Sequence, residues 1–326
     1  MESRFNIFYP QLNYDGPSPN YVQLELQITT YLIAILYQLF GYHYALARIV
    51  PVLFFMGSAF FLYRIGRLYF PERTALFAVA LYGVLPLNIL YSRAIMPESA
   101  ALFFMLGAFV FFTLWIRRDR LLLLLLAGLF TGVVAAEKIP TLFIGIPMLA
   151  MTMAKYKLRM LWKRELWLFA FLALVLPLLY FGWLGTVAES AFVSGIASKH
   201  VLPEMFSAIG TPEAWRFFYQ ELPSAFTWAG LILVPLGLLR LKWREAYPIG
   251  VWAAAMIVEL VTVVAVIKFD YYLILTSPVV ALLGAVALSD LSGAEWAGSQ
   301  QRRFCWRSAQ APSAAFIRCS IPSVRS

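Results

Sequence analysis

The sequence predicts an all-α polytopic membrane protein, a bundle of about nine transmembrane helices with one further helix at the membrane surface. Two observations predict this fold class. Of 326 residues, 62% are hydrophobic and only 13% are charged, whereas a soluble domain carries about 25% charged residues. Several apolar runs approach or exceed ~18 residues with almost no charge, which is long enough to cross a bilayer. The expected spans are residues 43–64, 74–92, 97–116, 121–137, 139–155, 166–184, 225–241, 246–267 and 271–289.

The segment before the first span is expected to lie on the membrane rather than to cross it. Residues 22–41 are only mixed apolar, because Glu25 and three glutamines interrupt them, and they end at Gly41. Such a pattern favours an interfacial helix that stops at the glycine. The first twenty residues lack a charged stretch followed by an apolar stretch, so no signal peptide is expected. Residues 1–42 are therefore predicted to form a juxtamembrane segment.

The basic residues set the expected orientation. The net charge is +9, and most Lys and Arg residues fall on one side of the nine-span arrangement. The positive-inside rule makes that side the cytoplasm. No soluble basic domain is visible, so nucleic-acid binding is not expected. The basic stretches are 64–73, 117–120, 155–165, 240–245 and the tail 291–326.

The tail changes character abruptly after residue 290. Residues 291–326 are rich in Ser, Ala and Arg without helical periodicity. They are expected to be a disordered, basic cytoplasmic tail, with a frame-shifted end as the alternative. Cys305 and Cys319, the two cysteines of the chain, both lie there, which gives no support to a disulfide framework or a zinc site.

The opposite, extracytoplasmic side holds few charges, and these recur at span ends. It comprises residues 1–42, the links at 92–98, 137–138 and 268–270, and the loop 185–224. The loop is predicted to contain short amphipathic helices lying on the bundle. A lid or acceptor-binding loop and a plain connector both remain open.

The link between the second and third spans carries Arg93 and Glu98. A short polar hinge needs no charges, so an anion-binding group and a carboxylate at this place indicate chemistry on a lipid-carried substrate. The alternatives are a surface ion pair, or a carboxylate in the first turn of a helix that begins at Pro97.

Three more charged residues stand near membrane depth, where ionisable groups are costly. Glu25 lies in the interfacial helix, and its alternative is a solvated polar face. Arg48 lies just inside the first span, where it either snorkels to the interface or pairs with a carboxylate or a phosphate. Lys138 follows Glu137, and a simple pair between them is the alternative to a phosphate contact.

A further outer cluster comprises Asp270, Tyr271 and Tyr272, although tyrosines also serve an aromatic belt. Asp15 lies in a stretch that contains Gly and Pro, and this pattern favours a turn residue. Glu259 lies inside a span and should face protein. Sequence fingerprints for nucleotide binding and for zinc hydrolases are missing from the chain, which favours a donor carried by a membrane lipid.

Several motifs in order resemble a known family. They are residues 47–51 (ARIVP), 64–70 (RIGRLYF), 85–98 (LPLNILYSRAIMPE), 137–140 (EKIP) and 270–273 (DYYL). Their order and spacing over roughly residues 5–290 are similar to polytopic lipid-linked-sugar glycosyltransferases of GT-C fold. These are the dolichyl-phosphate-mannose protein mannosyltransferase and aminoarabinose transferase type, glycosyltransferase family 39.

The resemblance implies transfer of a sugar from a polyprenyl-phosphate donor to a lipid, glycan or protein acceptor, as in protein glycosylation or cell-envelope modification. The reaction would occur at the extracytoplasmic face of the inner or plasma membrane, by direct inverting displacement. A carboxylate would activate the acceptor hydroxyl. Basic groups, often with a divalent metal ion, would stabilise the departing phosphate. Residues 43–290 would form the transferase-like domain.

The resemblance assigns roles to the residues of this chain that match the family pattern by position. Glu25 and Glu98 are the predicted catalytic residues. The predicted donor-phosphate contacts are Arg48, Arg93 and Lys138. Asp15, Asp270, Tyr271 and Tyr272 are predicted to line the substrate site. The ligands of a metal ion are not identified, and a divalent ion is only a candidate cofactor.

The chain also departs from the family pattern. Family members begin with an additional span and an outer loop carrying a catalytic aspartate, and Asp15 lies downstream of that position. Phe269 stands where many relatives have a polar residue or a histidine. A truncated, inactive product is therefore one expectation. Two different functions also remain open: a transporter or flippase, which would show inverted repeats that the sequence lacks, and a non-catalytic membrane subunit.

Overall fold

The computed structural model describes residues 8, 21–188 and 192–291, and the regular elements of this part are helices. Asp15, the other predicted features of the first twenty residues, and nearly all of the predicted tail lie outside the described residues. The α-helices of the first half are α1 (Ile28–Phe40), α2 (Tyr44–Tyr69), α3 (Glu72–Val84), α4 (Pro86–Tyr91), α5 (Glu98–Arg118), α6 (Leu121–Glu137) and α7 (Gly145–Tyr156).

The second half continues with further α-helices, and short 3-10 and π-helices occur between the α-helices from residue 139 on. The α-helices are α8 (Arg164–Val187), α9 (Phe192–Ile196), α10 (Leu202–Glu204), α11 (Pro212–Arg240), α12 (Trp243–Glu259), α13 (Ala265–Ile267) and α14 (Ser277–Leu291). The 3-10 helices are η1 (Ile139–Ile144), η2 (Lys157–Trp162), η4 (Ala208–Gly210) and η6 (Asp270–Thr276). The π-helices are η3 (Ala197–Val201) and η5 (Leu260–Val264).

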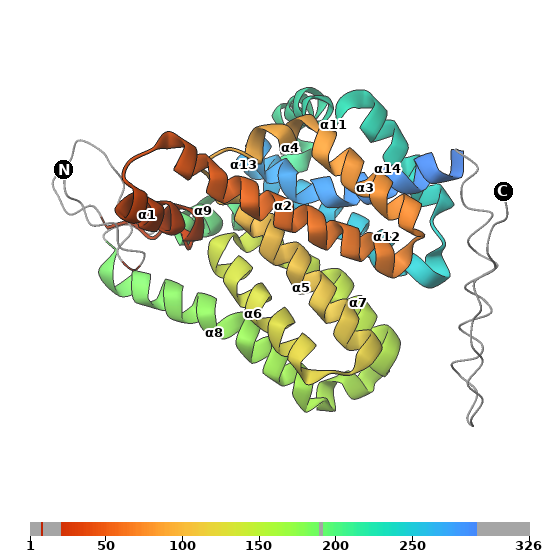
Figure 1. Ribbon diagram of the computed structural model, residues 1–326, viewed down its shortest axis with the longest axis horizontal. Coiled ribbons are helices and arrows are strands. Elements are labelled where there is room, and N and C mark those ends of the chain that lie inside the picture. Colours follow the sequence, from red (N-terminus) through yellow and green to blue (C-terminus); the bar gives the residue numbers. More distant parts are fainter. Residues whose placement is uncertain (1–7, 9–20, 189–191, 292–326) are drawn as a thin grey trace.

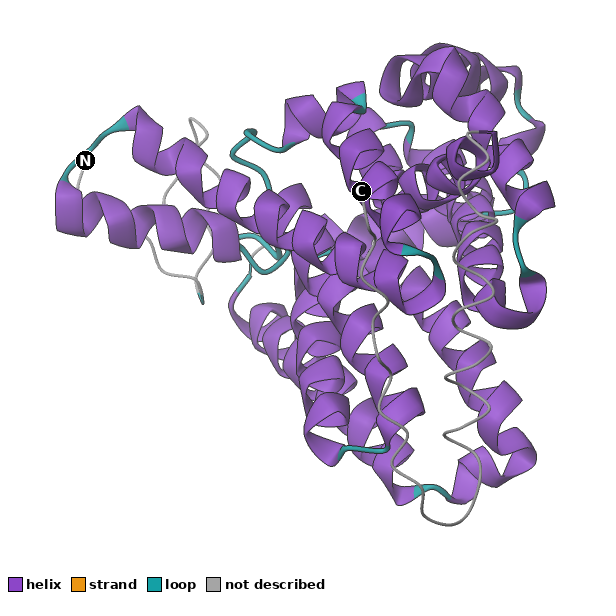
Figure 2. Cartoon of the chain, turned by 45° about the vertical axis from the view of Figure 1, so that its right-hand side comes forward, coloured by secondary structure: helices purple, strands orange, loops and turns teal. Residues whose placement is uncertain are grey.

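Two helices form the centre of the bundle. Most of α5 and α14 is buried, whereas α8 and α11 are mostly exposed. Helix α6 packs between α5 and α8, α14 packs between α11 and α3, and α2 contacts both α3 and α5 (Figure 1). Figure 2 shows that short loops join most of these helices. An apolar periphery around a buried centre is the arrangement expected of a bundle solvated by lipid.

The predicted fold class is confirmed. Within residues 8, 21–188 and 192–291, seven helical stretches are long and apolar enough to cross a membrane. They begin at α2, α5, η1, α8, α11, α12 and η6. The nine expected spans include two further segments. One is α6, a single apolar helix of 17 residues, and the other is divided into the shorter helices α3 and α4.

A proline explains why the expected span 74–92 is divided. Leu85 adopts extended dihedrals (φ −60°, ψ 129°) and separates α3 from α4. The residue before a proline is biased away from the helical region, and Pro86 is suited to the first turn of the next helix. Asn88 donates a hydrogen bond from Nδ2 to the Tyr82 carbonyl at 2.7 Å. This bond satisfies a carbonyl that the break leaves without its helical partner.

The expected surface helix and the long loop are both shorter than predicted. Helix α1 begins at Ile28, and the described residues 21–27 before it are not helical. The region 185–224 contains the expected short helices, but α11 already begins at Pro212. Thr227, with φ 60° and ψ 155°, interrupts α11. The predicted span 225–241 therefore corresponds to the second part of a longer, kinked helix.

Ion pairs join the basic turns to their surroundings at one end of the bundle. Lys155 contacts Asp119 at 2.9 Å, which links the turn after α5 to the end of α7. Arg240 contacts Asp290 at 2.9 Å, which links the ends of α11 and α14, and Arg67 pairs with Glu72 across the turn between α2 and α3. The basic turns that the sequence places on one side of the membrane thus lie at the ends of neighbouring helices.

Close packing of α11 against α14 depends on a glycine. A Cβ atom at Gly237 would overlap the carbonyl oxygen of Leu283, whereas a Cβ atom at Gly182 of α8 would meet no atom within 4 Å. Small residues allow this close approach of helix backbones in membrane bundles.

We predict that Gly237→Ala destabilises the protein by about 1–3 kcal/mol, because the backbones of α11 and α14 must separate. Thermal unfolding in detergent measures the loss, and Gly182→Ala is the matched control. Equal midpoints for the two variants would contradict this packing.

Candidate functional site

The predicted outer segments meet at the end of the bundle opposite the basic turns. Two backbone hydrogen bonds hold the non-helical residues before α1. The Leu26 amide donates to the Ala136 carbonyl at 2.9 Å, and the Val193 amide donates to the Gln23 carbonyl at 3.1 Å. The Tyr180 hydroxyl donates to the Glu25 carbonyl at 3.3 Å. Segments far apart in the sequence thereby hold Glu25 beside the end of α6.

A buried ion pair lies at the centre of this site. Lys138 Nζ contacts Glu98 Oε1 at 2.6 Å, and each side chain is only 1% exposed. Glu98 opens α5, so its carboxylate lies at the positive end of that helix dipole. Lys138 ends α6, so its ammonium lies at the negative end of that dipole. The two helix ends therefore favour the charges that the pair brings together.

Two tyrosines complete the surroundings of the ammonium group. Lys138 Nζ lies 4.6 Å from the ring centroid of Tyr271 and 4.5 Å from that of Tyr272. These distances allow cation–π attraction. The preceding residue, Asp270, accepts a hydrogen bond from the Tyr91 hydroxyl at 3.0 Å. Element η6 is thus attached both to Lys138 and to the end of α4.

Several carboxyl oxygens nearby have no hydrogen-bond partner within the described part of the chain. They are Glu98 Oε2 and both oxygens of Glu137 and Glu259, all buried. Glu137 interacts electrostatically with Glu25, Glu98 and Lys138, and Glu259 interacts with Lys138. Glu259 ends α12 directly before the π-helix η5. One ammonium group therefore faces more buried carboxyl groups than it can pair with.

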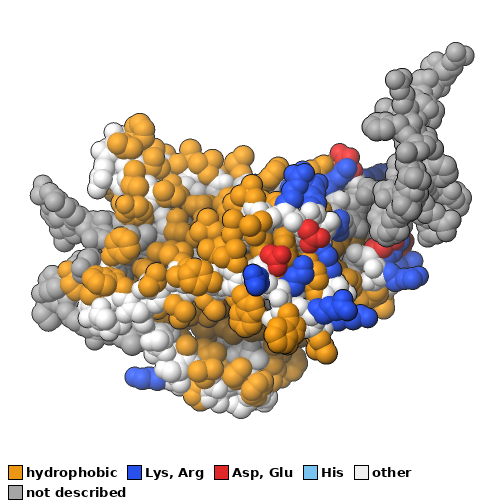
Figure 3. All heavy atoms as spheres, turned by 90° about the horizontal axis from the view of Figure 1, so that it is seen from below, with side chains coloured by type: hydrophobic (Ala, Val, Ile, Leu, Met, Phe, Trp, Pro, Cys, Tyr) orange, Lys and Arg blue, Asp and Glu red, His pale blue; other side chains and the backbone are white. Residues whose placement is uncertain are grey.

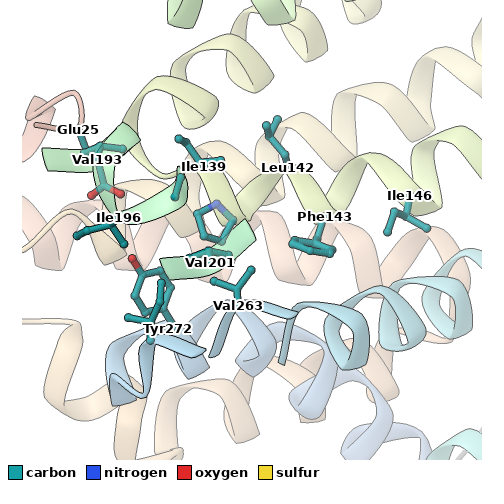
Figure 4. Close-up of a pocket in the computed structure, with 13 residues that line it drawn as sticks. Glu25, Ile139, Leu142, Phe143, Ile146, Val193, Ile196, Val201, Val263 and Tyr272 are labelled. Carbon is teal, nitrogen blue, oxygen red and sulfur yellow. The ribbon is translucent and has the colours of Figure 1, made fainter. Parts of the chain in front are cut away.

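An apolar pocket of about 380 Å³ opens beside the ion pair. Its polar residues are Glu25 and Tyr272, and Figure 4 shows both polar ends on one side of it. Aliphatic and aromatic side chains extend away from them along η1 and α7. Burial raises the pKa of Glu25 to about 7, against the opposing effect of Lys138, and Glu98 adds to the increase. The pocket thus offers a hydrocarbon-like lining and one carboxyl group that ionises near neutral pH.

The structure gathers some of the predicted site residues and separates others. Glu25, Glu98, Lys138, Tyr271 and Tyr272 lie together, and the Tyr91 hydroxyl holds Asp270 at the same end. Glu25 lines the pocket, whereas Glu98 is buried behind it. The direct catalytic roles of both carboxylates stay predictions.

Two predicted phosphate contacts are exposed instead. Arg48 donates a hydrogen bond to the Tyr44 hydroxyl at 2.8 Å, and its guanidinium carbon lies 4.5 Å from that ring. Arg93 is likewise exposed, on the link between α4 and α5. The alternatives of a surface pair involving Glu98 and of a Glu137–Lys138 pair are both wrong, because Glu98 and Lys138 pair with each other in the interior.

Sequence reasoning did not single out Gln23, Tyr91 or Tyr180 as parts of the site. Gln23 accepts from the Ser194 hydroxyl at 2.5 Å and so connects the N-terminal segment to α9. Tyr180 lies within an apolar run and carries no local signal. Glu259 was expected to face protein, and it does, with an exposed fraction of 0%.

Removal of one partner of the buried pair should be costly. We predict that Lys138→Met lowers the free energy of unfolding by about 3–5 kcal/mol, because the Glu98 carboxylate is left buried without a counter-ion. The double variant Glu98→Gln/Lys138→Met should regain most of this loss. Thermal unfolding of all four proteins in detergent forms a double-mutant cycle. Additive losses would show that the two side chains do not interact.

Comparison with protein families identifies one matching region. The family model for dolichyl-phosphate-mannose-protein mannosyltransferase matches residues 28–183. These residues include Glu98 and Lys138 and end within α8. A comparison with curated protein sequences gives no match.

Solved structures match almost the whole chain. ArnT from Cupriavidus metallidurans bound to undecaprenyl phosphate superposes with a TM-score of 0.65 at 17% identity, covering 89% of this chain and 54% of ArnT. Archaeal oligosaccharyltransferase AglB from Archaeoglobus fulgidus, in complex with an inhibitory peptide and a dolichol-phosphate, gives a TM-score of 0.56 at 14% identity, covering 90% of this chain and 45% of AglB. The chain spans about half the length of these proteins. It has the GT-C fold that ArnT and AglB share, and its residues 28–183 carry the sequence pattern of the dolichyl-phosphate-mannose-protein mannosyltransferase family.

Proposed function

We propose that this chain transfers a sugar from a polyprenyl-phosphate donor to an acceptor hydroxyl on a lipid, glycan or protein. The observation that carries the proposal is the apolar pocket that ends at Glu25 and Tyr272, next to the Glu98–Lys138 pair. The family match over residues 28–183 supports it. So does the fold shared with ArnT and AglB, whose solved structures hold undecaprenyl phosphate and dolichol-phosphate.

The lining of the pocket suits an isoprenoid chain. It is formed largely by branched aliphatic side chains and Phe143. Burying apolar surface supplies binding energy at about 25 cal/mol per Å², so a hydrocarbon carrier gains affinity here that a free nucleotide-sugar would not. The polar end of the pocket then receives the phosphate-sugar part of the same molecule.

Glu25 is proposed as the general base. Its carboxylate accepts the proton of the acceptor hydroxyl while the hydroxyl oxygen attacks the anomeric carbon of the sugar. The bond between that carbon and the phosphate oxygen breaks, and its electron pair stays on the phosphate. The products are the glycosylated acceptor and the polyprenyl phosphate, with inverted configuration at the anomeric carbon. A base with a pKa of about 7 is well matched to this task near neutral pH.

Lys138 is proposed to stabilise the departing phosphate. Its ammonium group is nearest to the polar end of the pocket but is engaged by Glu98 and covered by two tyrosine rings. A phosphate can therefore reach it only in exchange for part of these contacts. In this proposal Glu98 positions Lys138 until the donor binds. Arg48 and Arg93 are exposed and could contact the phosphate only after moving toward the pocket.

Among the described residues, the structure shows no set of ligands for a metal ion. Within the described ranges, no group of three or more His, Cys, Asp or Glu side chains is arranged to hold one. No step of the proposed reaction is therefore routed through a divalent ion.

The reaction is proposed to take place on the extracytoplasmic side. Support comes from the concentration of Lys and Arg in the turns at the opposite end of the bundle, which the positive-inside rule assigns to the cytoplasm. Residues 43–290 are proposed as the transferase-like domain and residues 1–42 as a juxtamembrane segment. The described residues of 21–42 and 192–224 are proposed to cover the outer end of the domain.

The proposed transfer can be measured with the purified chain in liposomes. We predict release of polyprenyl phosphate from polyprenyl-phosphate sugars when an acceptor is added. Glu25→Gln should lower the rate by about 10²–10⁴-fold, because the general base is lost. Glu213→Gln, at an exposed carboxylate in the first turn of α11, is the control and should keep the rate. No release from any of a panel of donor sugars would contradict the proposed function.

The pH dependence provides a separate check on Glu25. The transfer rate should rise with pH and level off above about pH 7, because the general base acts only when ionised and its pKa is raised to about 7. The pH profile of any residual rate in Glu25→Gln should lack this inflection. An unchanged inflection in that variant would assign the titration to another group.

A further inference from the structure

An exposed basic and aromatic surface lies at the end of the bundle opposite the pocket. It comprises the turn Arg117–Arg120 after α5 and the junction Tyr156–Arg164 between α7 and α8, and is named here the basic edge. With Lys155, these turns hold eight Lys or Arg residues, and Asp119 is their one carboxylate. Figure 3 shows basic side chains gathered on one part of a largely apolar face.

Local contacts join the two turns into one surface. Lys155 Nζ donates to Asp119 Oδ1 at 2.9 Å and to the Ile116 carbonyl at 2.5 Å, and the Tyr156 hydroxyl donates to Asp119 Oδ1 at 3.0 Å. Lys163 Nζ lies 4.5 Å from the centroid of the Tyr156 ring. The hydrogen bond from Lys155 holds the pKa of Asp119 below its usual range. Asp119 is thus satisfied by Lys155, and the exposed side chains of Lys157, Arg159 and Arg164 can reach an external anion.

Large apolar side chains stand among these cations with little protein contact. Within η2, Leu158 is 82% exposed and Trp162 is 87% exposed. On the following helix α8, Trp167 and Phe171 are also exposed, 66% and 61%. The apolar surface of the junction therefore continues onto the outer face of α8, which is apolar enough to face lipid. This continuity favours a membrane over a soluble protein as the occupant.

We propose that the basic edge is a docking surface for anionic phospholipid headgroups. The guanidinium and ammonium groups of Lys157, Arg159 and Arg164 would bind the phosphate oxygens, since Arg matches phosphate geometry with paired donors. Trp162 and Leu158 would insert beside the same lipids, because Trp favours the interface between headgroup and hydrocarbon. The occupant is thus a lipid with net negative charge rather than a zwitterionic one. The proposal does not depend on the glycosyl-transfer function.

The test measures lipid binding by the intact chain in neutral detergent. Phosphatidylglycerol or phosphatidylcholine is added in increasing amounts. The apparent affinity for each lipid is obtained from the shift in the thermal unfolding midpoint and from the number of bound lipids seen by native mass spectrometry. We expect phosphatidylglycerol to bind at least about tenfold more tightly, since each basic residue near the surface contributes to binding of anionic lipid. The difference should shrink as salt is raised. Equal binding of the two lipids would overturn the proposal.

Matched variants locate the surface. Arg159→Gln/Arg164→Gln should weaken phosphatidylglycerol binding about tenfold or more, whereas Lys242→Gln/Arg244→Gln, which removes the same charge from the turn between α11 and α12, should leave most of it. Equal losses in the two double variants would mean that overall charge, not the basic edge, attracts the lipid, and would overturn the assignment.

Two further measurements complete the test. Arg159→Lys/Arg164→Lys should retain binding, because the charge is kept. If Arg159→Gln/Arg164→Gln does not give folded protein, the single variant Arg159→Gln, at an exposed side chain, should still weaken binding severalfold, and no change in it would contradict the proposal. Inorganic phosphate at the same concentration of anionic charge should not shift the midpoint. An equal shift would indicate a free-phosphate site instead of a lipid surface.

Discussion

The rest of the site depends on the buried contact between Glu98 and Lys138. Two charges with about 1% exposure are stable together only because each compensates the desolvation of the other, and because the ends of α5 and α6 supply helix dipoles of matching sign. The pair joins the start of α5 to the end of α6, two consecutive helices, through residues that are 40 positions apart in the sequence. It also contacts η6 through the two tyrosine rings, and the pKa of Glu25 responds to both members of the pair. Glu25 and Tyr272, the two polar residues of the pocket, therefore both interact with the Lys138 ammonium group.

The bundle separates its charges into two kinds of environment. At the pocket end, carboxyl groups and one ammonium group are buried, so that each changes the electrostatics of its neighbours strongly. At the opposite end, the Lys and Arg residues are mostly exposed, and their ion pairs with Asp119, Glu72 and Asp290 are formed at the surface, where each contributes little to stability. Reactive chemistry is favoured by the first environment, and membrane attachment by the second.

Hydrophobic patterning predicted the all-α bundle and most of its helices, because a bilayer requires long apolar stretches and leaves few ways to satisfy the backbone. Charge at span ends indicated one outer face, and the family resemblance placed Glu25, Glu98 and Lys138 together in one site on it. It could not predict which charges pair, since Arg93 and Glu137 are nearer to the two partners in sequence than the partners are to each other. That choice depends on how α5 and α6 pack. Tyr180 and Gln23 were missed for a similar reason, because their partners lie more than a hundred residues away. The Pro86 break could have been read from the sequence, since a proline disfavours helical dihedrals in the residue before it.

The separation of α3 from α4 at Leu85 has a mechanical consequence. Helix α3 is anchored to α14, partly by the hydrogen bond between Thr74 and Ser289 at 2.8 Å. The six residues of α4, the link that carries Arg93, and the start of α5 follow the break. Leu85 still bonds to both helices, since its amide donates to the Leu81 carbonyl and its carbonyl accepts from the Ile89 amide. Pro86 has no N–H for the Tyr82 carbonyl, and the Asn88 side chain takes that place. One side-chain hydrogen bond thus replaces one backbone bond at the break, so α4 and the link after it can bend about this point more easily than an unbroken helix would.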